Sequence, residues 1–509
     1  GETDASSFPS GGLRATFEAR GYTTWDCTSP AFVRQDAGGA TLCIPTAFCS
    51  YTGEALDQKT PLLRSMEAVD KQAMRFVRLF GNTTSQKVTP SVGAEQEYFL
   101  VDRDKYLKRK DLVFTGRTLF GAMPPKGQEL DDHYFGAIRE RIALFMKDVN
   151  EELWKLGVSA KTQHNEAAPA QHELAPLFED ANTATDHNQL TMEMMKKVAK
   201  KHGLACLLHE KPFAGVNGSG KHNNWSLSTD TGVNFLKAGK NPSENKLFLL
   251  TLSAVIEAVD KHQDLLRIAV ATAGNDHRLG GHEAPPAVIS IFLGDELTNL
   301  LESVEKGLHH DDLKREKMRM GADIIPEFKK DNADRNRTSP FAFTGNKFEF
   351  RMLGSASSIS DTNVMLNTMV ADVFMEYATR LENAKDVNEE INAIIKKPQT
   401  IADGSAALTG LLLALVLPPE LPLYIPILGS VFAIVVVKGM FGGLGKNFMN
   451  PALAARCFLL ISYGAIVTVY KVDGVAMATP LVELAEGKAV DMVSVFWGGA
   501  SGVIGSTVV

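Results

Sequence analysis

Two glutamates spaced one residue apart are the first side chains in this sequence whose types and spacing suggest chemistry. Glu95 and Glu97 lie in the apolar segment 92–101, which is typical of a β-strand, so both carboxylates would point to the same face. Adjacent carboxylates repel each other and are costly to bury unless a cation lies between them. Since Mg²⁺ and Mn²⁺ prefer oxygen ligands, the pair predicts a metal site; an edge strand with a solvated acidic face is the alternative.

A second acidic segment offers Glu166 and Glu173, seven residues apart with Pro169 between them. In one straight strand these two side chains would point to opposite faces. We therefore expect a bend at Pro169, or a bulge, if both carboxylates serve one site. A surface loop is the alternative interpretation.

The glycine-rich segment 215–226 nearly spells the phosphate loop G-x-x-x-x-G-K-[ST]. His222 stands where a Ser or Thr would bind Mg²⁺, and the residues after it do not predict a helix, so we reject that interpretation. The glycines still allow the backbone to approach a ligand closely. His222 is therefore a candidate nitrogen ligand for a metal, with an ordinary core histidine as the alternative.

Basic residues follow in two further segments. Arg278 precedes a glycine-rich loop that contains Glu283, which offers a cation and a carboxylate or is simply a turn. Arg335 and Arg337 lie together, and paired guanidinium groups suit a polyphosphate; a solvated charged segment is the alternative.

Charged and aromatic residues alternate in the segment 347–351. Lys347, Glu349 and Arg351 would share a polar face of a strand, while the two phenylalanines between them enter the core. A half-buried strand with a charged face is the alternative. Five glutamates and a histidine in separate strand-like segments, with arginines and a glycine-rich loop, together predict a two-cation site that handles phosphates.

The elements that must position these side chains follow from the hydrophobic periodicity. Strands and helices interleave without a regular βαβ period, which predicts an α+β fold, and residues 1–60 suggest loops and short strands. Helices are expected over residues 61–85, 134–156, 186–202, 245–270 and 361–385, and strands over residues 92–101 and 341–352.

The composition changes near residue 400. The chain has 53 Lys and Arg and 60 Asp and Glu residues, of which only 11 lie in residues 401–509. The segment 421–437 is nearly uncharged and about as long as a bilayer-spanning helix requires. The first part is therefore predicted to be soluble and the second to be a membrane fragment.

The net charge of −7 does not show the excess of basic residues that is typical of nucleic-acid-binding proteins. Five cysteines without metal-ligand spacing indicate free thiols in a reduced compartment. The chain begins with Gly1 and shows no charged segment followed by an apolar run. We therefore expect no signal peptide and a start that is cut from within a longer protein.

The segments described above, in this order, resemble glutamine synthetase of the large type III form. The resemblance runs from Gly1 to about Ile395 and is carried by DASS at 4–7, FTGRTLFGAMPPKGQEL at 114–130, HEKPFAGVNGSGKH at 209–222 and EAPP at 283–286. It implies an α+β catalytic fold with an antiparallel sheet and flanking helices. Residues 1–60 would be the end of the N-terminal region, and residues 61–395 a catalytic domain truncated at its C-terminal end.

The resemblance also implies roles for individual residues. One cation, which organises glutamate, would be held by Glu97, Glu166 and Glu173, and a second, on the ATP phosphates, by Glu95, His222 and Glu349. Glutamate would be bound by Asn217, Gly218, Arg278 and Arg351, and ATP by Asn224, Ser226, Arg337 and Lys347. The catalytic residues would be Asp4, which deprotonates ammonium, Glu283, which closes the site, and Arg337.

The implied reaction is the ATP-dependent ligation of ammonia to L-glutamate, which gives L-glutamine, ADP and phosphate through γ-glutamyl phosphate. It implies two or more Mg²⁺ or Mn²⁺ ions, a cytoplasmic location for residues 1–395 and a homo-oligomeric ring whose active sites are shared between subunits. One departure concerns phosphate binding. Smaller bacterial members carry a further arginine shortly after the position of Arg337, where this chain has Ala342 or Phe343.

Residues from about 398 to 509 resemble a different family, the D-type membrane component of the Rnf ion-translocating oxidoreductase. The matching stretches are DGSAALTGLLLAL at 403–415, LPP at 417–419, FGGLGKN at 441–447, NPALAARCFLLIS at 450–462 and DGVAMATPL at 473–481.

This second resemblance implies a helical membrane fragment over residues 396–509, inserted over about 405–509, with other Rnf subunits as partners. It also implies FMN attached through a phosphoester to Thr479, although Ala476 and Met477 replace the usual Ser/Thr-Gly pair. A membrane subunit of an electron-transport complex is therefore the alternative function. Because the two families share no chemistry, a nonfunctional composite of two gene fragments is a third hypothesis, beside a natural fusion.

Overall fold

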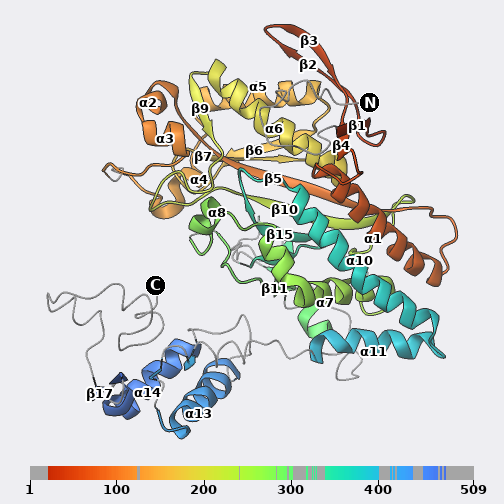
Figure 1. Ribbon diagram of the computed structural model, residues 1–509, viewed down its shortest axis with the longest axis vertical. Helices are drawn as coiled ribbons and strands as arrows, with labels where there is room; N and C mark the ends of the chain where they lie inside the picture. Colours follow the sequence, from red (N-terminus) through yellow and green to blue (C-terminus); the bar gives the residue numbers. More distant parts are fainter. Residues whose placement is uncertain are drawn as a thin grey trace. The chain divides into compact units, whose positions relative to one another are not determined.

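The computed structural model describes the chain in several stretches. These are residues 21–122, 126–239, 241–281, 284–294, 297–301, 317–318, 324, 326, 328–329, 339–400, 413–414, 417–418, 421–439, 451–467, 471–472 and 475–476. The chain divides into two compact units, Gly1–Gln399 and Thr400–Val509. Figure 1 shows the elements of both units.

A nine-stranded sheet forms the centre of the first unit. Its main path runs in the order β11-β14-β15-β10-β5-β7-β6, and β8 and β9 also pair with β5. Its described pairings are antiparallel except for β11 with β14. The strands are β5 (Val88–Asp102), β6 (Ala160–Asn165), β7 (Gln171–Pro176), β8 (Glu179–Asp180), β9 (Leu204–Leu207), β10 (Gly220–Thr229), β11 (Ile291–Phe292), β14 (Phe341–Phe343) and β15 (Phe348–Gly354).

Long helices cover one face of this sheet. In Figure 1, α1 and α10 lie side by side, and α10 also packs against α7. Helices α5 and α6 pack together, and α6 contacts β5 and β9. The helices are α1 (Lys59–Leu79), α5 (Glu140–Lys155), α6 (Ala181–Lys201), α7 (Lys246–Ile268), α10 (Ser360–Glu382) and α11 (Val387–Thr400).

The alternation of side chains along β5 explains the two different faces of the sheet. Val92, Ala94 and Tyr98 are buried in the apolar clusters that the helices complete. Because successive residues of a strand point to opposite faces, Glu95 and Glu97 point away from those helices. The sheet therefore has an apolar face under helices and a face that carries the acidic side chains.

Shorter elements surround the sheet. Strand β1 (Gly21–Trp25) pairs with β4 (Thr46–Ser50), β2 (Phe32–Asp36) with β3 (Gly39–Cys43), and β12 (Lys317–Met318) with β13 (Phe328–Lys329). The short helices are α2 (Arg103–Lys108), α3 (Lys110–Thr115), η2 (Glu129–Asp131), α4 (Asp132–Phe135) and α8 (Ala273–Arg278). The five cysteines are all free.

Most of the expected helices are confirmed, with shifted ends. The single helix expected over 134–156 is wrong, because α4 ends before Gly136, whose backbone is extended, and α5 begins at Glu140. The single strand expected over 341–352 is also wrong, because β14 and β15 form a hairpin whose turn contains Gly345 at φ +92°. That conformation favours glycine, which lacks a Cβ, and it reverses the chain there.

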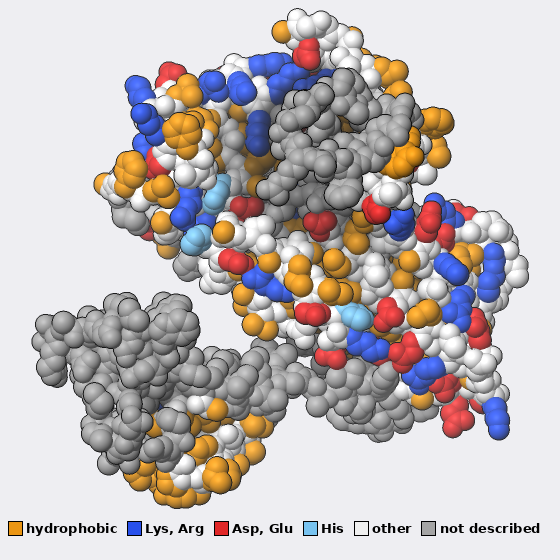
Figure 2. Space-filling model, in the orientation of Figure 1, with side chains coloured by type: hydrophobic (Ala, Val, Ile, Leu, Met, Phe, Trp, Pro, Cys, Tyr) orange, Lys and Arg blue, Asp and Glu red, His pale blue; other side chains and the backbone are white. Residues whose placement is uncertain are grey.

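The second unit has helix α13 (Tyr424–Val431), the π-helical segment η3 (Phe432–Gly439), helix α14 (Pro451–Val467) and the short strands β16 (Lys471–Val472) and β17 (Val475–Ala476). Leu413, Ile425, Ala433 and Leu459 belong to a small apolar cluster of its own. Figure 2 shows hydrophobic side chains exposed on its described surface. Ile461 of α14 is an exposed hydrophobic residue of this unit. None of the helices in the described stretches combines the length and the hydropathy that crossing a bilayer requires.

Candidate metal and phosphate site

The register of the sheet brings the acidic side chains together. Glu95 on β5 lies opposite His222 on β10, and Glu97 lies opposite Glu173 on β7. Directly opposite residues of antiparallel strands have Cβ atoms about 5 Å apart. Three neighbouring strands therefore contribute to one row of carboxylates and imidazole.

The expected bend between Glu166 and Glu173 is present. Strands β6 and β7 form an antiparallel pair, and the chain turns between them through residues 166–170. Ala170 has φ +66° in this turn, a left-handed conformation that costs about 1–2 kcal/mol for a residue with a Cβ. The turn places Glu166 beside the row that Glu173 occupies, which one straight strand would not do.

His222, Glu95 and Glu349 form the first cluster of the site. The His222 Nδ1 atom lies 2.8 Å from Glu349 Oε1 and 3.1 Å from Glu95 Oε2. Around them, Asn224 donates to Glu95 Oε1 at 3.0 Å, and Arg351 Nη2 lies 3.2 Å from Glu349 Oε2. All three predicted ligands of the phosphate-side cation thus meet around one nitrogen.

Glu166 and Glu173 form the second cluster together with His164, a residue to which no role was assigned, and Glu97 lies opposite Glu173 on the neighbouring strand. His164 Nε2 lies 2.8 Å from Glu173 Oε2, and its Nδ1 lies 3.6 Å from Glu166 Oε1. Glu97 Oε2 accepts the backbone N–H of Gly220 at 2.7 Å. The glutamates are buried, so their charges need partners within the protein or a bound cation.

The electrostatics of both clusters favour added positive charge. Burial lowers the pKa of His222, but the carboxylates of Glu349 and Glu95 outweigh that effect and raise it well above its usual value. Burial raises the pKa of Glu173. The hydrogen bond with Glu173 raises the pKa of His164 to about 9. The raised pKa values of His222 and His164 indicate that the neighbouring carboxylates favour a nearby positive charge.

The donor set fits hard divalent cations. Ligand atoms of Glu95, Glu173 and His222 lie within 4.8 Å of one another, as do those of His164, Glu166 and Glu173. Glu173 Oε1 is buried and has no hydrogen-bond partner among the described residues. Carboxylate oxygens with one or two imidazoles are ligands that Mg²⁺ and Mn²⁺ accept in proteins.

The residues expected to bind glutamate divide between the two clusters. Gly218 lies near Glu97, since Gln171 donates to the Gly218 backbone oxygen at 2.9 Å and lies 3.4 Å from Glu97 Oε2, whereas Arg351 lies beside Glu349. Asn217 exchanges hydrogen bonds of 2.8 Å with Gln128, and Arg278 donates to the backbone oxygens of Arg351 and Leu353. A Cβ on Gly218 would lie 2.2 Å from the backbone oxygen of residue 210. Only glycine fits there, which explains one glycine of the 215–226 segment.

A cavity of about 250 Å³ adjoins the first cluster, on the side of β10 and β7. Lys347 Nζ donates to Asn224 Oδ1 at 2.6 Å, and the Ser226 hydroxyl donates to the backbone oxygen of Asn346 at 2.7 Å. The walls include Glu95, Phe178, Asn224, Ser226, Asn346 and Lys347. The cavity therefore combines a cation, polar groups and an exposed aromatic ring beside the candidate metal ligands.

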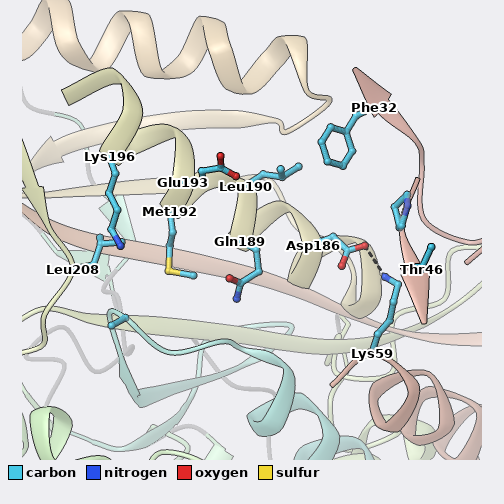
Figure 3. Close-up of a pocket in the computed structure, with 12 residues that line it drawn as sticks. Phe32, Thr46, Lys59, Asp186, Gln189, Leu190, Met192, Glu193, Lys196 and Leu208 are labelled. Atoms are coloured by element: carbon cyan, nitrogen blue, oxygen red, sulfur yellow. Dashed lines mark hydrogen bonds and ion pairs between the residues drawn. The ribbon is translucent and has the colours of Figure 1, made fainter. Parts of the chain in front are cut away.

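A larger cavity, of about 590 Å³, lies beside α6 and is shown in Figure 3. Its charged side chains are mostly paired, since Lys59 lies 2.6 Å from Asp186 and Glu193 lies 2.6 Å from Arg34. None of the candidate metal ligands is among the described residues that line it. Size alone therefore does not identify the site.

Five predicted residues lie outside the described part of the chain, so no geometry is given for them. They are Asp4, Glu283, Arg335, Arg337 and Thr479.

Sequence reasoning missed three residues of the site. His164 lies two residues before Glu166, but its place opposite Glu173 depends on the β6–β7 pairing. Phe178 follows Glu173 by five residues and is 72% exposed in the smaller cavity, without any spacing signal. Gln128 is distant in sequence from Asn217 and is identified only by their contact.

Family models match three parts of the chain. Residues 1–65 match "Glutamine synthetase type III N terminal", residues 75–288 match "Glutamine synthetase, catalytic domain", and residues 358–509 match the "NQR2, RnfD, RnfE family".

Several individual proteins are similar to parts of this chain. A type-3 glutamine synthetase of Dictyostelium discoideum is 58% identical over 372 residues, which are 73% of this chain and 51% of that protein. The D-type component of the Na⁺-translocating ferredoxin:NAD⁺ oxidoreductase complex of Acetobacterium woodii is 48% identical over 121 residues, 23% of this chain and 38% of that protein. A Plasmodium falciparum glutamine synthetase structure aligns with a TM-score of 0.49 and 17% identity, over 74% of this chain and 66% of that one.

The chain spans only about half the length of the curated glutamine synthetases that it matches, at 51%, 52% and 46%.

Replacement of Glu349 by Gln is predicted to weaken Mn²⁺ binding by at least about tenfold, because it removes a charged ligand from the first cluster. The measurement is a titration of the full chain with Mn²⁺, followed by the electron paramagnetic resonance signal of the free ion. Glu140→Gln, an exposed residue at the start of α5, is the matched control. Equal affinities of the two variants would remove Glu349 from the site.

Proposed function

We propose that the first part of this chain ligates ammonia to L-glutamate with ATP. The chain joins glutamine synthetase type III domains to a region of the NQR2, RnfD, RnfE family. The observation that carries the proposal is the convergence of six predicted ligands from β5, β6–β7, β10 and β15 on two adjoining clusters. Because the chain covers about half of its relatives, the activity of the whole enzyme is inferred from these residues.

The reaction needs an activated carboxylate. A carboxylate is a poor electrophile, and transfer of the ATP γ-phosphoryl group to it gives γ-glutamyl phosphate, whose phosphate leaves readily. Two bound Mg²⁺ or Mn²⁺ ions would supply neutralising charge to the transferring group. Arg351, held beside Glu349, would add a guanidinium at the same place.

The smaller cavity suits the nucleotide. Lys347 and Asn224 lie on its wall beside Glu95, so a triphosphate there would reach the first cluster. The exposed ring of Phe178 offers a flat apolar surface against which a purine can stack. Arg337 is proposed as a further phosphate contact by resemblance alone.

Ammonia attacks only as the neutral molecule, so a proton must be removed and water kept out. We assign these tasks by resemblance to Asp4 and Glu283. In the family, the aspartate reaches the site of a neighbouring subunit, so we propose a homo-oligomeric ring with shared active sites. A cytoplasmic location for residues 1–395 belongs to the same proposal.

The test of the ligase function is phosphate release from ATP by the purified full chain. Release is expected to require glutamate, ammonium and Mg²⁺ together, and Glu97→Gln should lower the rate at least about a hundredfold because it removes a metal ligand. Glu140→Gln should leave the rate unchanged. Phosphate release that is independent of glutamate, or undiminished in Glu97→Gln, would contradict the proposal.

The second part of the chain supports a second function. Its match to the NQR2, RnfD, RnfE family and its 48% identity to a D-type Rnf component favour a membrane subunit of an ion-translocating electron-transport complex. We propose that this part inserts in a membrane over about 405–509, binds other Rnf subunits and carries FMN on Thr479. The apolar surface of α13 and α14 supports a membrane environment.

Covalent FMN is tested by coexpression of the full chain with a flavin transferase. The denatured chain is expected to fluoresce in a gel, and Thr479→Ala should abolish the signal because it removes the hydroxyl that forms the phosphoester. Thr468→Ala, a nearby threonine outside the quoted motif, is the matched control. A wild-type chain without fluorescence, or an equally bright Thr479→Ala variant, would exclude attachment at this residue.

We place the boundary between the two parts near residue 395. Ile391, Ile394 and Ile395 of α11 are buried in the core of the first unit, although the second family match begins at residue 358. A natural fusion and a composite of two gene fragments differ in the source DNA.

Amplification of source DNA with primers that flank codons 390–405 distinguishes these two origins. Because a composite has no continuous template, we expect no product if the chain is a composite. One unbroken product of the expected sequence would instead establish a natural fusion.

A further inference from the structure

We propose that Glu210 and Lys221 are positioning residues that hold the turn after β15 from two sides and thereby fix the metal ligand Glu97. The inference rests on the proposed function, since it concerns the cation site of the same reaction. Neither residue touches the carboxylate clusters, and no role has so far been given to either.

Lys221 is completely buried on the apolar side of the sheet. It precedes His222 on β10, so its side chain points away from the metal ligands. Its amine donates to the backbone oxygens of Ser355, at 2.6 Å, and Ser357, and lies 3.5 Å from the sulfur of Met192. The buried lysine amine therefore binds two carbonyl groups of the turn after β15.

Glu210 contacts the same turn at a different backbone group. It is 5% exposed, and its Oε1 atom accepts the backbone N–H of Ala356 at 3.2 Å. A Cβ on Gly354 or on Gly274 would lie 2.5 Å from a carboxylate oxygen of Glu210. The two glycines therefore leave the space that the carboxylate occupies.

The turn thus meets complementary groups at three successive residues. Lys221 binds the carbonyls of Ser355 and Ser357, and Glu210 binds the N–H between them. Backbone groups that are buried without hydrogen-bond partners destabilise the conformation that buries them. Loss of either side chain would leave such groups unpaired and allow the turn to shift.

The turn is tied directly to a metal ligand. The hydroxyl of Ser355 donates to the backbone oxygen of Glu97 at 2.6 Å, and Gln96 donates to the Ser355 hydroxyl at 2.8 Å. The backbone N–H of Ser355 also donates to Ser219, next to Gly220, whose own N–H binds the Glu97 carboxylate. A shift of the turn therefore displaces Glu97 through both its backbone oxygen and its carboxylate.

The same turn connects β15, which bears Glu349 and Arg351, to helix α10. Hydrogen-bond partners that orient metal ligands typically change metal affinity by about 10–100-fold when they are removed. The contacts of Glu210 and Lys221 with this turn form a clamp. We therefore expect the clamp to act on cation affinity rather than on the chemistry of substrates.

The experiment is a titration of the full chain with Mn²⁺ alone, followed by the paramagnetic resonance of the free ion, with Tm measured in parallel. Lys221→Met and Glu210→Leu are expected to weaken binding by about tenfold or more, and Glu210→Gln, which keeps an acceptor for Ala356, by less than about threefold. Lys196→Met, an exposed lysine on α6, is the control and should match the wild type.

Ser355→Ala supplies a variant with little risk of unfolding, since it removes only the hydroxyl that reaches Glu97. It should weaken Mn²⁺ binding in the same direction, by about tenfold. Mn²⁺ affinity within about twofold of wild type in Ser355→Ala, or in a folded Lys221→Met variant, would overturn the clamp. A wild-type chain that binds no Mn²⁺ would instead contradict the proposed function itself.

Discussion

The repulsion between carboxylates that share one face of a buried sheet is the constraint on which the first unit depends. Glu97, Glu166 and Glu173 are almost fully enclosed by protein, and Glu95 and Glu349 border a single imidazole. Burial of such charges is costly unless cations or well-placed donors offset them. The raised pKa of His222 and of His164 reports this demand for positive charge.

The sheet meets this demand by separating its two faces. Aromatic and aliphatic residues of β5, β10 and β15 pack under α1, α7 and α10, and this large apolar core holds the strands in register. Register decides which side chains oppose each other, so the apolar face fixes the geometry of the acidic face. The clamp around the turn after β15 connects the two faces at one point, because Lys221 lies on one and Glu97 on the other.

Local periodicity predicted the parts of this site that lie within one strand. The spacing of Glu95 and Glu97 and the alternation around Glu349 required only the pleat of a strand. The sequence did not reveal which strands would be neighbours, and so His164, Phe178 and Lys221 received no role. The 341–352 segment was expected to be one strand because its apolar pattern continues across a turn that depends on Gly345. The residues that the resemblance added, such as Asp4 and Glu283, rest on motifs alone.

The two parts of the chain have different chemistry, and the ligase proposal depends on the first part alone. The most direct measurement of its central claim is anomalous X-ray scattering at the manganese edge from crystals of the full chain grown with Mn²⁺. We expect two separate peaks, one among Glu95, His222 and Glu349 and one among Glu97, Glu166 and Glu173. Peaks elsewhere, or no peak within this row of side chains, would contradict it.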